Sequence, residues 1–229
     1  MNLFILAKAA KAAASAHNDK HVIKMILECA QLLYTCWHFG RSDVQWQADA
    51  FPKHCGKCDT FNIECKTCTK CVFKPYRATH RNHPIAIWTR MNKSHYDYTV
   101  DLGLSLCKEY TRRYGKVHRT QMHLEMFKKM GFPTHVGEET YAPPKHKTAT
   151  YNTPEGTEYF YCAINDELWP KCATYTEDGR LDCIATYRAY YQAKDMDHKW
   201  CRGAQEPPVW FKRKRDDVDE PNAKRIKVI

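Results

Sequence analysis

The sequence predicts a mainly α protein: a compact helical bundle with an irregular, cysteine-rich, metal-binding insert and a disordered basic C-terminal tail. Two observations carry this prediction. Apolar residues recur at 3.6-residue spacing in several segments, and strands do not alternate regularly with helices as a doubly wound sheet requires. We expect residues 1–210 to form a single helical domain with the insert at 41–82, and residues 211–229 to form the tail.

The first two helices are predicted at 8–16 and from Lys20 to about Trp37. Alanine and lysine give the first one high helix propensity, and Asn18 or Asp19 is expected to cap the second. The second segment has the clearest helical periodicity. Its apolar positions, which we expect to face the core, are Ile23, Ile26, Leu27, Ala30, Leu33, Tyr34 and Trp37.

The later helices are marked by their stop and start residues. Pro84 suits a first turn, whereas Gly115 and Gly131 suit C-terminal stops. We expect helices at 84–92, 94–114, within 118–131, and at 181–198. Residues 132–176 are rich in Pro, Thr and Tyr, which indicates an extended loop with short strands at best, at 157–164 and 171–177. "NLFIL" near the start indicates a short buried strand or extended segment.

The charge balance favours a polyanionic partner. Lys and Arg total 36 against 26 Asp and Glu, a formal charge of +10, and the chain also holds 14 Tyr, 9 Phe and 6 Trp. Nucleic acid, and DNA in particular, is the first candidate, and a basic soluble protein without such a partner is the alternative. No membrane partner is expected, because the apolar run Leu3 to Leu6 is too short to span a bilayer and no basic region precedes it, as a secretory signal would require.

Five of the twelve cysteines form a cluster with metal-ligand spacing, namely Cys55, Cys58, Cys65, Cys68 and Cys71. Two-residue spacing lets one tight turn direct two thiolates at one metal, and four thiolates make a tetrahedral Zn²⁺ site. The first four are the simplest set, with Cys71 able to replace Cys68 and His54 as a spare ligand. An iron–sulfur cluster is the alternative. Because all-cysteine ligation leaves no open position, we expect a structural zinc site that folds the insert.

The tail carries two basic runs, "KRKR" at 212–215 and "KRIK" at 224–227, separated by an acidic spacer. The stretch "PNAKRIKV" resembles a monopartite nuclear localisation signal, and together with "KRKR" it also fits a bipartite one, which importins bind. We therefore expect a nuclear protein that engages importin through its tail. A basic arm on nucleic acid, in a cytoplasmic protein, is the alternative.

The helix that begins at Lys20 carries a set of residues suited to chemistry. Positions 20, 24 and 28 stack along one helix face, with His21 beside them, so Lys24 and Glu28 can pair. Lys20 and His21 lie near the helix start, where phosphate is favoured. The alternative is a solvated face with one intrahelical ion pair.

A second set of cations interleaves with aromatic residues. The stretch "EYTRRYGKVHRTQ" and the helix at 84–92 provide candidate nucleic-acid contacts, which are Arg112, Arg113, Lys116, His118, Arg119, Trp88 and Arg90. Cations on phosphates and aromatic rings on bases suit such a partner. The alternative is a helix terminus in which Glu109 pairs with Arg112 or Arg113.

Several motifs keep their order in a family of phage, giant-virus and bacterial proteins that this chain resembles. They are "NLFIL", "DKHVIKMILE", "LCKEYTRRYGKVH" and a "P-W" pair near the end, and the resemblance covers most of residues 1–131 and 181–211. The layout is more distantly similar to that of endonuclease V, the phage pyrimidine-dimer DNA glycosylase. That resemblance implies an all-helical enzyme whose N-terminal amine forms a Schiff base with the damaged sugar and whose helix glutamate acts as the acid/base.

By this resemblance Glu28 is the acid/base, and Lys20, His21 and Lys24 hold phosphates. Because Asn2 is large, Met1 is expected to stay, so the nucleophile is Met1's own amine or a lysine such as Lys24.

The leading hypothesis is therefore a viral-type DNA glycosylase/lyase whose catalytic residues are Glu28, Lys24 and His21. Such an enzyme flips its target base, for which Trp88, Tyr96 or Tyr114 would supply stacking. A non-enzymatic, zinc-stabilised DNA- or RNA-binding protein is the second hypothesis. A virion or host-interaction protein is the third.

Overall fold

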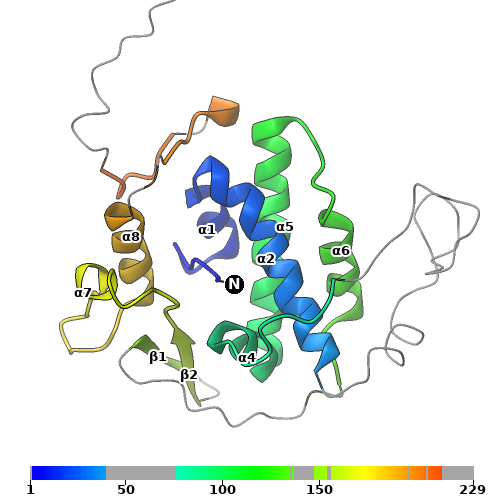
Figure 1. The fold of residues 1–229 in the computed structure, drawn as a ribbon, viewed down its shortest axis with the longest axis horizontal. Coiled ribbons are helices and arrows are strands. Elements are labelled where there is room, and N and C mark those ends of the chain that lie inside the picture. Colours follow the sequence, from blue (N-terminus) through cyan, green and yellow to red (C-terminus); the bar gives the residue numbers. More distant parts are fainter. Residues whose placement is uncertain are drawn as a thin grey trace, which may run out of the picture.

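The structure is a computed structural model that describes residues 2–39, 76–134, 136, 147–153, 156–194, 196, 198–204 and 206–212. Most of the described residues are helical, which confirms the mainly α prediction. Figure 1 shows the arrangement: helices α2 and α5 lie at the centre, and the other helices and one hairpin surround them.

The central pair forms because both helices are long and have strong N-terminal caps. Helix α2 spans Asp19–His38 and α5 spans Lys93–Tyr114. The side chain of Asn18 accepts a hydrogen bond from the His21 amide at 2.7 Å, and Asn92 caps α5 in the same way at 2.9 Å. Gly115, with φ of 65°, ends α5 as predicted.

Three more helices pack around α2 and α5. They are α1 (Ala10–Ala16), α4 (Pro84–Met91) and α6 (Gln121–Met130). Helix α1 lies on α5, α4 contacts both central helices, and α6 lies beside α5 (Figure 1). Gly103 of α5 allows α6 and α2 to pack closely against it, since a Cβ there would lie 2.8 Å from a Leu124 methyl and 3.1 Å from Cβ of Cys29.

Part of the predicted loop at 132–176 is an antiparallel hairpin. Strands β1 (Thr148–Thr153) and β2 (Gly156–Tyr161) pair with Thr148 opposite Tyr161 and Thr153 opposite Gly156. The expected strand at 157–164 thus exists in shortened form. Phe160 explains the placement of the hairpin, because its buried ring packs edge-on against Trp88 of α4.

The expected strand at 171–177 is wrong. Helix α7 (Trp169–Cys172) takes its first residues, and only an isolated bridge between Tyr175 and Leu181 follows. Helix α8 spans Cys183–Ala193 and ends earlier than predicted, at extended Lys194. The chain then returns to the start of α2, where η2 (Arg202–Ala204) lies on α5.

The burial of α2 differs from the pattern expected from its periodicity. Ile23 and Leu27, expected in the core, are 40% and 38% exposed, whereas His21 and Glu28 are buried. The reason is tertiary, because α2 is enclosed by neighbours on several sides and not on one. Burial there follows the partners that each side chain finds.

The seven cysteines of the described residues are free thiols, and all of them except Cys201 are buried. No helix in the described ranges is both long enough and apolar enough to span a membrane.

Candidate functional site

Glu28 is the centre of the candidate site, and the start of the chain lies directly on it. Its Oε2 accepts a hydrogen bond from the backbone amide of Asn2 at 2.6 Å. Its Oε1 lies 3.4 Å from Nζ of Lys24, one turn earlier on α2. The glutamate side chain is 12% exposed and the lysine side chain 69%. A largely enclosed carboxylate is therefore paired with an amine that reaches solvent.

The side chain of Asn2 is held by two residues that come much later in the sequence, Ala163 and Tyr187. Its Nδ2 donates to the carbonyl of Ala163 at 2.9 Å, and its Oδ1 accepts from the hydroxyl of Tyr187 at 2.8 Å. Tyr187 is fully buried and also accepts from the Ala163 amide. These contacts hold the Asn2 amide on Glu28, so one carboxylate oxygen keeps a fixed orientation.

His83, the N-cap residue of α4, is a further titratable group near Glu28. Its Nδ1 accepts a hydrogen bond from the Ile85 amide at 3.2 Å. Burial lowers the pKa of His83, and the negative charge of Glu28 acts in the opposite direction. His83 is thus favoured as a neutral imidazole close to the carboxylate.

His21 does not share the surface of Lys24. It is buried, its Nδ1 lies 2.5 Å from the hydroxyl of Tyr191, and its ring packs on Phe4. Burial, with nearby positive groups, lowers its pKa to about 2. The expectation that His21 holds a phosphate is therefore wrong, because its ring is enclosed by Phe4 and Tyr191.

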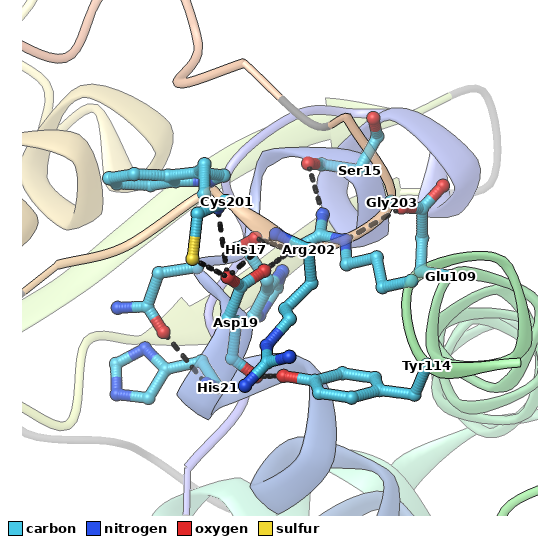
Figure 2. Close-up of polar contacts among 12 residues, drawn as sticks. Ser15, His17, Asp19, His21, Glu109, Tyr114, Cys201, Arg202 and Gly203 are labelled. Atoms are coloured by element: carbon cyan, nitrogen blue, oxygen red, sulfur yellow. Dashed lines mark hydrogen bonds and ion pairs between the residues drawn. The ribbon is translucent and has the colours of Figure 1, made fainter. Parts of the chain in front are cut away.

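A second carboxylate, Asp19, organises the start of α2 (Figure 2). Its Oδ1 accepts from Nη1 of Arg113 at 3.1 Å, and its Oδ2 accepts from the amides of Cys201 and Arg202 at 3.0 and 3.2 Å. The Asp19 amide donates to the carbonyl of Lys199 at 2.8 Å. We call Asp19, Arg113 and residues 199–202 the Asp19 hub.

Arg113 belongs to this hub and not to a nucleic-acid surface. Its side chain has no exposed area, and it donates also to the carbonyls of Ser15 and His17 and to Glu109. Burial alone would raise the pKa of Glu109, but the contacts from Arg112 and Arg113 outweigh it and lower that pKa. The alternative of a salt-bridged helix end thus describes Arg113 and Glu109.

Arg112, Lys116 and Arg119 are exposed at the end of α5, and His118 is half-buried there. The hydroxyl of Tyr114 donates to the carbonyl of Asp19 at 3.0 Å, which places this end beside the start of α2 and exposed Lys20. Arg112 is engaged with Glu109 and the Gly203 carbonyl, and His118 accepts from the Thr120 amide. Lys20, Lys116 and Arg119 are the exposed predicted cations for which no such contact is described.

Trp88 and Arg90 are enclosed within the fold. The indole of Trp88 stacks on His95 at 4.1 Å, and Arg90 lies over the ring of Phe39 while donating to the Arg81 carbonyl. Both are buried, so the expectation that they contact nucleic acid is wrong for this conformation. Tyr96, proposed for stacking, is buried as well.

The five metal-ligand cysteines, Met1 and residues 213–229 of the tail lie outside the described residues. Among the residues that the structure does describe, no group of three or more His, Cys, Asp or Glu side chains is arranged to hold a metal ion.

Comparisons of the chain with protein-family models, with curated proteins and with solved structures find no match.

The sequence analysis did not identify Asn2 or Asp19 as site residues. Asp19 was considered only as a cap, and nothing local in the sequence shows that its partners are near residues 113 and 201.

Proposed function

We propose that this protein is a nucleic-acid-processing enzyme of the DNA glycosylase/lyase kind, acting through Lys24 and Glu28. The observation that carries the proposal is the pair itself, in which an exposed amine lies 3.4 Å from a carboxylate held in place by the Asn2 amide. An amine nucleophile with an adjacent acid/base is the minimal set for imine chemistry on a sugar.

The chemistry follows from this placement. An ammonium must lose a proton before it attacks, and the Glu28 carboxylate is the nearest acceptor. Nζ of Lys24 then bonds to C1′ of an abasic sugar in its aldehyde form. The protonated Glu28 returns the proton to the departing hydroxyl, so that water leaves and an imine forms. Glu28, which is again a carboxylate, then takes a C2′ proton from the imine as the C3′–O bond breaks, so the 3′ phosphate leaves and the strand is cleaved.

Exposed cations support DNA as the partner. Lys20 and Lys24 lie on the same side of α2, and Lys116 and Arg119 follow at the adjoining end of α5. The formal charge of +10 adds a general attraction for a polyanion. Tyr114 lies at this end and is half-buried, so it is the remaining candidate for stacking on a displaced base.

Borohydride trapping tests the proposal. The full chain is incubated with abasic DNA and sodium borohydride, which reduces the imine to a stable secondary amine, and the adduct is mapped by peptide mass spectrometry. We expect a covalent adduct on Lys24 that is lost in Lys24→Gln and reduced at least 100-fold in Glu28→Gln. Lys93→Gln is the matched control, because Lys93 is also exposed and paired at i,i+4, with Asp97.

Two results would contradict the proposal in different ways. An adduct on another amine would keep the lyase activity and remove Lys24 as its nucleophile. Salt-dependent DNA binding with no adduct at all would favour the second hypothesis, a non-enzymatic nucleic-acid-binding protein.

The cysteine cluster and the tail complete the proposal. Cysteine spacing supports a structural zinc at Cys55, Cys58, Cys65, Cys68 and Cys71, and the basic runs support importin binding and a nuclear location. One Zn²⁺ per chain, measured on purified protein, is the expected result. Iron with visible absorption would favour the iron–sulfur alternative.

A further inference from the structure

Helix α2 is buried along its whole length except for one narrow stripe. The residues of α2 that are not buried are Lys20, Ile23, Lys24, Leu27 and Gln31, whose spacing follows one side of the helix. Every other residue of α2 is enclosed by the fold, so whatever contacts this helix from outside meets these side chains. We call them the α2 stripe.

The α2 stripe alternates cations with large apolar side chains. Ile23 and Leu27 are 40% and 38% exposed and lie one turn apart, about 5–6 Å between Cβ atoms. Single exposed apolar residues are ordinary, but two neighbours on one stripe form a continuous apolar surface. Lys20 and Lys24 flank them, which suits a partner with phosphates around an apolar contact.

We propose that Ile23 and Leu27 form a wedge that enters an opened base step of double-stranded DNA while Lys20 and Lys24 contact the flanking phosphates. Apolar wedges of Leu, Ile, Phe or Met partly unstack base steps in proteins that bend DNA from the minor groove. The occupant is duplex DNA because the flanking side chains are cationic and the whole chain carries +10.

The wedge rests on the proposed function and extends it to the recognition of double-stranded substrate. Lys24 lies beside Ile23 and Leu27 on the stripe, and Glu28 follows it one turn later. An amine so placed reaches C1′ in a duplex only after the local stack opens. The two apolar side chains would hold that opening while Lys24 and Glu28 act.

A fluorescence experiment that needs no chemistry tests the wedge. The probe is a duplex with a tetrahydrofuran abasic analogue and 2-aminopurine as the neighbouring base, whose emission rises on unstacking. We expect a several-fold rise with the wild-type chain and at least a threefold smaller rise with Ile23→Ser/Leu27→Ser. Affinity should change less than about threefold and keep its salt dependence, because the lysines remain.

Met122→Ser is the matched control, since Met122 of α6 is also an exposed apolar residue, at 41%, outside the α2 stripe. It should give the wild-type rise. The same rise in Ile23→Ser/Leu27→Ser would overturn the wedge. A change in oligomeric state with an unchanged rise would also overturn it, in favour of a second copy of this chain on the stripe.

Trapping on single-stranded abasic DNA separates the two proposals. Single strands need no opening, so Ile23→Ser/Leu27→Ser should trap there as well as the wild type does. If the wild type traps nothing while the fluorescence difference persists, the lyase proposal fails and the wedge stands. A loss of trapping on single strands in the double variant would contradict a role confined to opening the duplex.

Discussion

Asp19 and Glu28 are two carboxylates on the same helix with opposite surroundings. Asp19 pairs with Arg113, whose side chain has no exposed area, and both of its oxygens receive donors from residues distant in sequence. Glu28 pairs with Lys24, which is 69% exposed. A fully satisfied, closed pair holds elements together, whereas a pair that is open on the amine side is free to exchange its partner for a ligand.

Removing Asp19 should have the largest effect on stability. Asp19→Ala removes one of the two carboxylates that Arg113 contacts, leaving Glu109, and frees two backbone amides, so we expect a loss of about 4–5 kcal/mol in the free energy of unfolding. Urea denaturation measures it. Asp101→Ala, which breaks an exposed pair with Lys128, is the control and should change stability by under about 1 kcal/mol. Equal losses of stability in the two variants would show that burial of the Asp19–Arg113 pair adds nothing to the free energy of unfolding.

Acidification should have the second largest effect on stability, through the buried histidines near Asp19. Burial lowers the pKa of His17 to about 4 and that of His21 to about 2, so both stay neutral in the fold at pH 5. In the unfolded chain they gain protons below about pH 6.5, so stability falls as the pH drops from there. For the two together we expect a loss of roughly 4 kcal/mol between pH 7 and 5.

His123 of α6, with its pKa lowered to about 4 by burial, adds a similar contribution outside this region. Denaturation of His123→Gln at several pH values removes this contribution, so that His17 and His21 dominate the remaining loss of stability in acid. A flat profile in that variant would rule out neutral, buried His17 and His21.

A substitution at Gly203 tests how closely the segment around η2 approaches α5. Its φ is 61°, and a Cβ would lie 2.8 Å from the Arg112 carbonyl oxygen and from Cα of Arg113. Gly203→Ala should therefore destabilise by about 3 kcal/mol, the sum of left-handed strain and backbone contact. Gly179→Ala is the control for strain alone, about 1 kcal/mol, because nothing lies near its Cβ position. Thermal melts of both variants measure the difference.

The smallest effect on stability is expected at the open pair. Lys24→Gln should change the free energy of unfolding by under about 0.5 kcal/mol, because exposed ion pairs contribute little. The same variant should lose the trapped adduct completely. A large loss of stability would mean that Lys24 serves the fold, and the contrast with Asp19 would disappear.

Local signals predicted the helices well. Periodicity and the stops at Gly115 and Gly131 located α2, α5 and α6, because caps and apolar spacing act within one element. Of the hairpin, only a strand overlapping β2 was expected and β1 was assigned to a loop, since the placement of the hairpin depends on Phe160 meeting Trp88 across the fold.

For the site, sequence spacing gave the Lys24–Glu28 pair but not the burial of its neighbours. His21 looked like a surface cation because its partner Tyr191 is 170 residues away. Arg90 and Arg113 were predicted to contact nucleic acid for the same reason. The sequence around an arginine does not show which backbone carbonyls will accept its hydrogen bonds in the fold.

The Asp19 hub also has a consequence for the order of biosynthesis. Asp19 and Arg113 are synthesised early, but the amides that complete their shell lie at Cys201 and Arg202, up to 183 residues after Asp19. Until residues 201 and 202 are present, Oδ2 of Asp19 lacks the two backbone amides that donate to it in the fold. The Asp19 hub can therefore close only after residues 201 and 202 have been synthesised, so its closure is a late step in the folding of residues 19–202.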